Sequence, residues 1–266
     1  MSTTSSSNPV VVALANQKGG VGKSTTAINM AASLAFQGSR VLLVDLDPQG
    51  NATSGLGIDR GAIEVSVYDV LLKEAGLDDA IEPTSVRDLF VVPATIDLAG
   101  AEIELVSQFS RETRLRGALA DTEQEFDVIL IDCPPSLGLL TVNALVAAQE
   151  VLIPIQCEYY ALEGVTQLLR NVELVTNNLN PGLKVGGVVL TMYDGRTKLS
   201  KEVAEQVRLH FGDTAYRTVI PRSVRLSEAP SYGEPIEAFD PMSRGAIAYR
   251  HLGREFLQKH QLEKES

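Results

Sequence analysis

The chain has 266 residues, 44% of them hydrophobic, and a body of this size can bury one large core, so we expect a single domain. Its formal net charge of −11 by itself argues against a polyanionic partner. Two cysteines, Cys133 and Cys157, suit a reducing compartment and provide no disulfide framework, and no apolar run reaches the length of a membrane span.

The first nine residues are rich in serine and threonine and lack both a basic region and an apolar stretch. We therefore expect residues 1–9 to form a disordered tail and not a signal peptide. Residues 10–260 alternate apolar runs with amphipathic ones. This alternation predicts one α/β domain with a doubly wound, mostly parallel sheet and helices on both faces. Residues 261–266 are expected to form a polar C-terminal tail.

The order of the expected elements follows from the same alternation. Strands are expected at Val10–Asn16, Val41–Asp45, Leu89–Val92, Val128–Asp132, Val151–Ile155 and Val185–Thr191, with a short one near Val219. Helices are expected at Ser24–Gln37, Val67–Ala75, Leu98–Val106, Arg111–Ala120, Thr141–Ala148, Gly164–Asn178, Lys201–Phe211 and Arg244–Gln258. The glycine-rich polar segment Pro48–Gly61 is expected to be a loop.

A phosphate-binding loop lies between the first expected strand and the first expected helix. It follows the pattern G-x-x-x-x-G-K-[ST], except that Gln17 stands in place of the first glycine. Its glycines let backbone N–H groups surround a phosphate chain, and the N-terminus of the next helix adds partial positive charge. Lys23 is expected to reach the β- and γ-phosphates and the Ser24 hydroxyl to hold Mg²⁺. Lys18, at the front of the loop, is either a solvated lysine or a second phosphate-directed cation. The predicted ATP-binding residues of the loop are Lys18, Gly19, Gly20, Val21, Gly22, Lys23, Ser24 and Thr25.

Two of the expected strands end in carboxylates, at the edge where α/β sheets place their ligands. Asp132 ends an apolar strand, and a carboxylate there suits Mg²⁺, either directly or through water. Asp45 ends another strand and is a further candidate metal ligand. Asp47 begins a proline-containing turn, and turn chemistry alone could explain it. The functional interpretation is that Asp47 positions the attacking water, next to a loop that senses the γ-phosphate.

The charge distribution departs from the acidic average of the chain. Between Lys184 and Arg225 there are eight cations and four anions, a local charge of +4. This segment is either a solvated surface of mixed charge or a site for a polyanion.

Longer motifs make a family resemblance specific. They are Lys18–Thr25, Asp45–Asn51, Ile131–Leu137, Gln156–Gly164 and Val219–Pro230. With them the chain closely resembles the deviant Walker A ATPases and, among these, the ParA or Soj chromosome-partition ATPases, from about Val11 to Tyr249. Ser24 replaces the commoner threonine of the family but keeps the hydroxyl.

The resemblance implies an ATP- and Mg²⁺-dependent cycle in which ATP closes two subunits face to face. Lys18 matches the lysine that reaches across to the partner's ATP, Asp47 the carboxylate needed for hydrolysis, and Asp132 the Walker B aspartate. Pro221 is a further expected ATP contact. Together with the loop lysine Lys23, Lys18 and Asp47 form the expected catalytic set.

The resemblance also implies what the ATP-bound dimer does. It is expected to bind double-stranded DNA without sequence preference, in the cytoplasm on the nucleoid, and not to bind membrane. A centromere-binding partner, ParB or Spo0J, is expected to stimulate hydrolysis and release the dimer. The expected DNA-binding residues are Arg196, Lys201, Arg222 and Arg225.

Three rival interpretations share parts of this pattern. The division-site ATPase MinD binds membrane through a basic amphipathic C-terminal helix, whereas Phe256–Ser266 is polar with alternating charge. The nitrogenase iron protein uses two cysteines per subunit for a cluster, but Cys133 and Cys157 lack the glycine-rich surroundings of that family and suit buried apolar positions. A non-enzymatic DNA-binding module is disfavoured by the intact set of loop and carboxylate residues.

Overall fold

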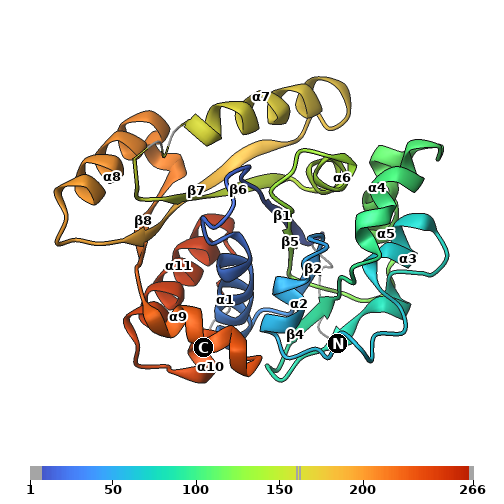
Figure 1. The fold of residues 1–266 in the computed structure, drawn as a ribbon, viewed down its shortest axis with the longest axis horizontal. Coiled ribbons are helices and arrows are strands. Elements are labelled where there is room, and N and C mark those ends of the chain that lie inside the picture. The colour runs from blue at the N-terminus through green and yellow to red at the C-terminus, as the bar shows by residue number, and fades with distance from the viewer. Residues whose placement is uncertain (1–7, 160, 162, 264–266) are drawn as a thin grey trace, which may run out of the picture.

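A central eight-stranded sheet organises the molecule, which is described here for residues 8–159, 161 and 163–263 by a computed structural model (Figure 1). The strand order is β3-β4-β2-β5-β1-β6-β7-β8, and every neighbouring pair is parallel except β3 with β4. The strands are β1 Val10–Leu14, β2 Val41–Asp45, β3 Glu82–Pro83, β4 Leu89–Val92, β5 Val128–Asp132, β6 Glu150–Gln156, β7 Lys184–Tyr193 and β8 Ala215–Pro221.

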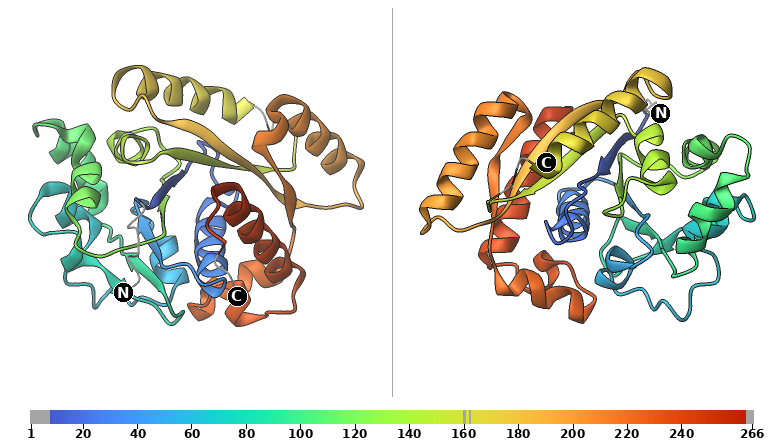
Figure 2. Two further views of the ribbon diagram at one scale, coloured as in Figure 1. Left: turned by 180° about the vertical axis from the view of Figure 1, so that it is seen from behind. Right: turned by 45° about the horizontal axis from the view of Figure 1, so that its top comes forward.

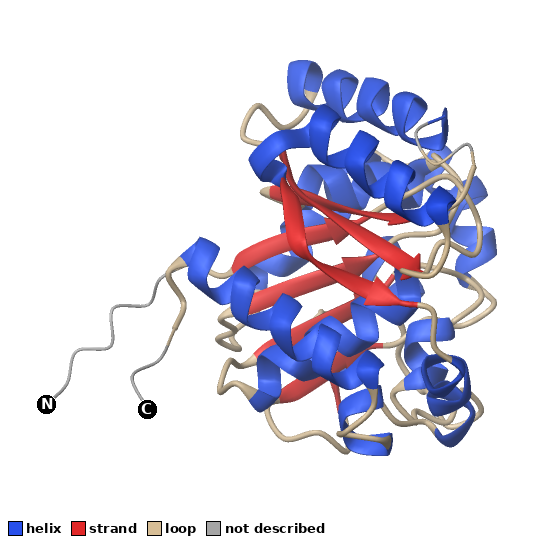
Figure 3. Cartoon of the chain, turned by 90° about the vertical axis from the view of Figure 1, so that its left-hand side faces the viewer, coloured by secondary structure: helices blue, strands red, loops and turns tan. Residues whose placement is uncertain are grey.

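Helices cover both faces of this sheet, which confirms the predicted α/β class (Figures 1 and 3). The α-helices are α1 Lys23–Phe36, α2 Asn51–Gly55, α3 Val67–Leu72, α4 Leu98–Val106, α5 Arg114–Asp121, α6 Leu139–Ala147, α7 Glu163–Asn178, α8 Lys198–Phe211, α9 Val224–Glu228, α10 Ile236–Phe239 and α11 Arg244–His260. Helices α1, α9, α10 and α11 contribute to the core on one face, and α3 to α8 to the core on the other. Figure 2 shows α1 and α11 side by side.

The strands are almost continuously apolar because both of their faces are buried. In β1, Val11 and Ala13 belong to the core under α6 and α7, while Val12 and Leu14 belong to the core under α1 and α11. Helix α1 lies in the middle of the second core, and its alanine-rich sequence lets it pack closely against both the sheet and α11. This packing holds the start of α1 at the carboxyl end of β1.

The structure corrects the sequence-based prediction in the segment Pro48–Gly61, which contains the short helix α2 and is not wholly a loop. The helix follows Gly50, whose φ of 63° lies in the left-handed region that glycine tolerates. Its backbone is held by Asp45, a residue outside the segment, so the local composition could not predict it. The elements β3, α9 and α10 are also additions to the predicted set.

Two helices begin at positions that differ from the predicted ones. Helix α8 begins at Lys198, three residues before the predicted Lys201, because the Thr197 hydroxyl accepts a hydrogen bond from the Ser200 N–H at 3.2 Å. The predicted helix Arg111–Ala120 begins as a 3₁₀ turn over Arg111–Thr113, and the α-helix proper starts at Arg114.

Residues 1–7 of the predicted N-terminal tail and residues 264–266 of the predicted C-terminal tail lie outside the described residues. The Pro9 carbonyl accepts a hydrogen bond from the Gln149 side chain at 3.2 Å, and Leu262 is partly buried against the core. Among the described helices, none combines the length and the apolar character needed to cross a bilayer.

Candidate nucleotide-binding site

Side chains from neighbouring strands hold the phosphate loop, which connects β1 to α1. The Asn16 side-chain amide donates to the Pro154 carbonyl of β6 at 2.7 Å, and its oxygen accepts from the Lys18 N–H at 3.0 Å. Farther along the loop, the Thr191 hydroxyl of β7 donates to the Val21 carbonyl at 2.8 Å. These hydrogen bonds attach the loop to β6 and β7.

Two glycines of the loop adopt backbone angles that other residues rarely take. Gly20 has a φ of 74° and Gly22 a φ of 87°. The left-handed region disfavours residues with a Cβ atom, so the loop needs glycine at both positions. This conformation places Gly22 directly before the first residue of α1, where helix N–H groups are free to bind anions.

Lys23 and Asp132 are charged side chains that are both buried next to the phosphate loop. Lys23 opens α1 and is only 7% exposed. Burial lowers the pKa of Lys23, and the negative charges of Asp132 and Asp47 oppose that shift. A buried lysine loses the water that solvates its charge at the surface. An anionic ligand bound in the phosphate loop would replace that solvation.

Asp132 is fully buried at the end of β5. Burial, reinforced by the neighbouring Asp45, raises the pKa of Asp132 well above its usual range. Neither carboxylate oxygen has a hydrogen-bond partner of ordinary geometry among the described residues, although the Ser24 hydroxyl is near enough to offset part of the pKa rise. A buried, unpartnered carboxylate beside a hydroxyl is a donor set that fits Mg²⁺.

Asp45 lies beside Asp132, one strand away in the parallel pairing of β2 and β5. One of its oxygens accepts hydrogen bonds from the Thr53 N–H at 2.8 Å and the Thr53 hydroxyl at 2.7 Å, and the other accepts from the Asp47 N–H at 3.1 Å. Burial raises the pKa of Asp45 to about 6, and these bonds counteract it. Asp45 therefore holds the Asp47 turn and α2 in place; its role as a metal ligand stays a prediction.

Asp47 reaches the cavity that the phosphate loop encloses. This cavity has a volume of about 420 Å³ and is lined by Gly19, Gly20, Gly22, Lys23, Ser24, Thr25, Ile28, Asp47, Gln49, Asn51, Pro135, Met192 and Pro230. One oxygen of Asp47 accepts from the Gln49 N–H at 2.9 Å. The structure thus brings Asp47 together with the loop residues, as a water-positioning carboxylate requires.

A second cavity of about 320 Å³ continues from the first and shares Gly22, Thr25, Met192 and Pro230 with it. Pro221, the predicted ATP contact, lines this part, together with Ile220, Leu226 and Tyr249. Apolar walls next to a phosphate loop suit the flat base of a nucleotide.

The sequence-based prediction missed several residues of this cleft. Thr191 and Met192 come from the end of β7, and no motif within that strand marks them. The one available signal was that carboxyl ends of parallel strands meet at a single edge of the sheet. Tyr249 of α11 lines the cleft, and its hydroxyl lies 3.2 Å from the Thr26 hydroxyl.

Of the predicted loop residues, Lys18 and Val21 line neither cavity of the cleft of their own chain. Lys18 is half-buried and lies beside the start of α7, where a Cβ added at Gly164 would be 3.6 Å from the Lys18 Cβ. Val21 is buried and serves the loop through its carbonyl. The other predicted loop residues line the first cavity.

The predicted DNA-binding residues lie at the β7–α8 and β8–α9 connections and in α8 and α9. Arg196 makes a two-pronged contact with Asp194, at 2.9 and 2.7 Å. Arg222 pairs with Glu158 at 2.8 Å. The Arg196 hydrogen bonds lower the pKa of Asp194 to about 2, and the backbone N–H of Arg222 donates to the carbonyl of the adjacent Tyr193 at 3.1 Å.

The remaining two predicted DNA contacts are farther along these elements. Arg225, on α9, pairs with Glu228 at 3.1 Å and with Asp240 at 3.3 Å, and its guanidinium lies over the Phe239 ring. Lys201 is exposed on α8. The structure therefore places Arg196 and Arg222 together and holds Arg225 by separate contacts.

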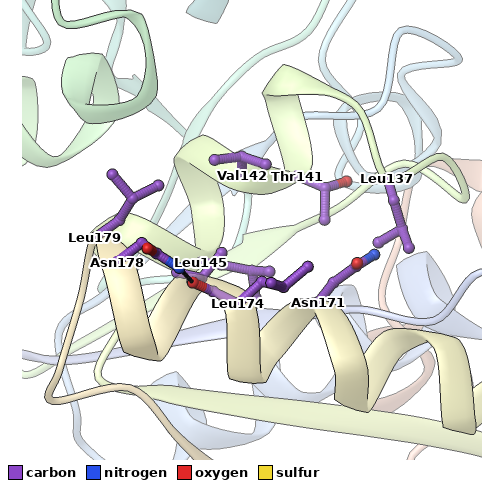
Figure 4. A pocket seen from close by; sticks show the side chains of 9 residues that line it. Leu137, Thr141, Val142, Leu145, Asn171, Leu174, Asn178 and Leu179 are labelled. Atoms are coloured by element: carbon purple, nitrogen blue, oxygen red, sulfur yellow. Dashed lines mark hydrogen bonds between the residues drawn. The ribbon is translucent and has the colours of Figure 1, made fainter.

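Both cysteines are buried, and burial raises the pKa of each thiol, that of Cys157 to about 11. Both side chains belong to the hydrophobic core, where cysteine packs as a small apolar residue. A further apolar cavity of about 280 Å³ lies between α6 and α7 (Figure 4). None of the predicted site residues lines it.

Comparisons with known proteins agree with this geometry. A domain family described as "AAA domain" matches residues 10–185. The sporulation initiation inhibitor protein Soj of Bacillus subtilis is 59% identical over 245 residues, covering 92% of this chain and 97% of that protein. The chromosome partitioning protein ParA of Myxococcus xanthus is 54% identical, over 94% of this chain and 88% of that protein.

Solved structures give the same result. The crystal structure of cobyrinic acid a,c-diamide synthase from Mycobacterium smegmatis, with bound ATP analog and magnesium, is 42% identical with a TM-score of 0.84, covering 96% of this chain and 97% of that one. The fold and the phosphate loop define a P-loop nucleoside triphosphatase of the ParA/MinD type. Within that class, the chain belongs to the ParA/Soj family of chromosome-partitioning proteins.

Proposed function

We propose that this protein is an ATPase that segregates chromosomes: an ATP-bound dimer binds DNA, and hydrolysis releases it. The observation that carries the proposal is a two-part cleft lined by Lys23, Ser24 and Asp47, with the fully buried Asp132 close to Lys23 and Ser24. Its features match what a magnesium nucleotide presents: phosphates, a metal ion and a flat base.

The residues of the cleft would have different roles in hydrolysis. The loop N–H groups and Lys23 would bind the phosphates, and Ser24 and Asp132 would hold Mg²⁺, whose positive charge would offset the negative charge of the phosphates. Asp47 would orient the attacking water, because it lines the phosphate cavity together with Lys23 and Ser24. Asp45 keeps the Asp47 turn in place through its hydrogen bonds to that turn and to Thr53.

Dimerisation accounts for Lys18, which is redundant for its own chain because Lys23 already serves those phosphates. Its place beside α7, outside the cleft linings, leaves it available to the ATP of a facing subunit. Such a sandwich would also double the set of Arg196, Lys201, Arg222 and Arg225, which makes a weak DNA site in one subunit. ATP would then switch DNA binding on, and a ParB-type partner would stimulate hydrolysis and end it.

A MinD-like membrane role is the alternative, and the C-terminal helix argues against it. In α11, Leu252, Phe256 and Leu257 are buried in the core. A helix that binds a membrane surface must present its apolar face to lipid, and these side chains of α11 face the protein instead. We therefore propose that the protein acts in the cytoplasm, on nucleoid DNA.

DNA binding measured with ADP, with ATP and with a slowly hydrolysed ATP analogue tests this function. We expect affinity for DNA of any sequence to rise with ATP or the analogue and to be low with ADP. Phosphate release in the presence of Mg²⁺ tests the enzyme directly, with Lys23→Ala as the inactive control. Tight DNA binding with ADP, or strong preference for one sequence, contradicts the proposal.

A further inference from the structure

The turn that carries Asp47 is held on its outer side by an arginine that lies outside the cleft. In this turn the Gly50 N–H donates to the Asp47 carbonyl at 2.8 Å, and Pro48 and Gln49 are the two central residues. The guanidinium of Arg60 donates to both central carbonyls, to that of Gln49 at 2.8 Å and to that of Pro48 at 3.3 Å. Arg60 is exposed and lines neither cavity of the cleft.

The guanidinium of Arg60 lies directly against the turn, at a position that glycine leaves open. A Cβ atom added at Gly50 would be 2.9 Å from both the Cζ and the Nε atoms of Arg60. A side chain at this position would therefore displace the guanidinium from the turn. The φ of 63° at Gly50 independently favours glycine there.

Gln49 connects Arg60 to the carboxylate of Asp47. The Gln49 carbonyl accepts from Arg60, and the Gln49 backbone N–H donates to one carboxylate oxygen of Asp47 at 2.9 Å. On the inner side, the buried Asp45 accepts from the Asp47 N–H at 3.1 Å. The backbone of Asp47 is thus held by a buried carboxylate, while its side chain is held by a residue that an exposed guanidinium restrains.

We propose that Arg60 is a positioning residue for ATP hydrolysis: by holding Gln49, it fixes the orientation of the Asp47 carboxylate in the lining of the phosphate cavity. The inference rests on the proposed function and adds a residue outside the cleft on which the rate of hydrolysis depends. A group that orients a reacting water works only within a narrow range of positions, so a less ordered turn would slow hydrolysis without weakening nucleotide binding.

Steady-state kinetics of ATP hydrolysis separates these two effects. Arg60→Ala should lower kcat about 3- to 10-fold, as expected when exposed hydrogen bonds that order a reacting group are lost. KM for ATP should stay within about twofold of its original value, because the phosphate loop and Lys23 are unchanged. Arg60→Lys should give an intermediate kcat, since an ammonium keeps the charge but lacks the planar fork that bonds two neighbouring carbonyls.

Amide hydrogen exchange measured by mass spectrometry reports on the turn itself, without nucleotide. Arg60→Ala should speed exchange in peptides that cover residues 46–56, because the turn loses its outer contacts. Exchange in β1 and β5 should stay as it is in the unaltered protein. A general loss of structure would instead speed exchange throughout the sheet.

A second substitution shows whether Arg60 acts through Asp47. In an Asp47→Ala background, Arg60→Ala should cause no further loss of kcat, because the carboxylate that it positions is gone. A guanidinium whose charge acted directly on the phosphates would lower kcat by the same factor in both backgrounds. The matched control is Arg87→Ala, at an arginine that is 94% exposed and pairs with Asp88 at 3.3 Å. It should leave kcat, KM and the exchange of residues 46–56 unchanged.

The positioning role is overturned if Arg60→Ala keeps the parental kcat, if it raises KM instead, if exchange in residues 46–56 is unchanged, or if the loss of kcat persists without Asp47. If the unaltered protein hydrolyses no ATP in the presence of Mg²⁺, the proposed function fails and this inference with it. If the unaltered protein hydrolyses ATP and Arg60→Ala behaves as Arg87→Ala does, only the inference about Arg60 fails.

Discussion

At the scale of one residue, a substitution of Asp47 can separate ATP binding from ATP hydrolysis. Asp47 lines the phosphate cavity, while the loop and Lys23 are proposed to bind the phosphates themselves. Asp47→Ala should therefore bind ATP as the unaltered protein does and hydrolyse it roughly 100-fold or more slowly, because only the positioning of the attacking water is lost. Binding of a fluorescent ATP analogue and phosphate release measure the two effects separately.

The control for this substitution is Asp59→Ala, which removes an exposed aspartate whose side chain accepts a hydrogen bond from the nearby Gly61 N–H at 2.9 Å. It should leave ATP binding and hydrolysis nearly unchanged. Hydrolysis at the parent rate by Asp47→Ala would show that another group orients the water.

Asp132 illustrates how a functional residue lowers stability. Its buried carboxylate lacks a hydrogen-bond partner of ordinary geometry among the described residues, and its charge is disfavoured by burial and by Asp45. Asp132→Asn should raise the melting temperature of the nucleotide-free protein by a few degrees, as about 1 kcal/mol corresponds to about 2–4 °C in a chain of this size. The same variant should lose Mg²⁺-dependent nucleotide binding. Thermal unfolding with and without magnesium nucleotide checks both effects, and a lower melting temperature without nucleotide would contradict this expectation.

The residues of the phosphate loop could be predicted from the sequence because their chemistry is local. Glycines with free backbone angles, a lysine and a hydroxyl must follow one another within a few positions for the loop to work. Thr191 and Met192 could not be found in this way. They reach the loop only because β7 lies two strands from β1 in the sheet, and strand order is a property of the whole fold.

The secondary-structure elements, too, could be predicted only where local sequence determines them. Strands such as β2, β4 and β5 have the bounds predicted from their apolar runs, because burial on both faces determines their composition. Helix α2 was missed because its anchor is not in its own sequence: the Asp45 carboxylate binds the Thr53 backbone and hydroxyl, and that hydroxyl accepts from the Ala94 N–H at 2.9 Å. Contacts between distant segments decide such short elements.

Glu150 connects the last helix to the sheet, and its titration gives a pH prediction at the scale of elements. Its carboxylate accepts a hydrogen bond from His260 of α11 at 3.1 Å and pairs with Lys184 of β7 at 3.0 Å. The His260 contact, assisted by Lys184, lowers the pKa of Glu150 to about 2. An unfolded glutamate titrates near about pH 4.3, so the stabilisation is fully present above about pH 5 and is lost as the pH falls toward about 2.

Glu150→Gln should accordingly reduce the free energy of unfolding by on the order of 2 kcal/mol at about pH 7, and the difference from the unaltered protein should shrink at about pH 3. Urea unfolding at both pH values measures it. The exposed Glu125→Gln serves as the control and should have little effect at either pH. An equal effect of the two substitutions would mean that the contact between α11 and β6 adds nothing to stability.

At the scale of the whole molecule, the sequence indicated the class of fold and the family. The proposed dimer depends on Lys18, a residue for which a single chain offers no role. Lys18 belongs to the phosphate loop in sequence, yet it lies beside α7 and lines neither cavity of its own cleft. Lys18→Ala should therefore weaken ATP-driven dimerisation and hydrolysis much more than ATP binding, since the lost cation would serve the facing subunit.

Analytical ultracentrifugation with ADP and with a slowly hydrolysed ATP analogue distinguishes this arrangement from a lysine that acts within its own chain. The unaltered protein should be monomeric with ADP and dimeric with the analogue, and Lys18→Ala should stay largely monomeric with both while still binding the nucleotide. Lys23→Ala offers the contrast, because it should lose nucleotide binding itself and dimerisation only as a consequence. A Lys18→Ala protein that dimerises fully would show that Lys18 has no role across the dimer interface. The pairing of two sets of DNA-binding arginines would then need a different contact between the two chains.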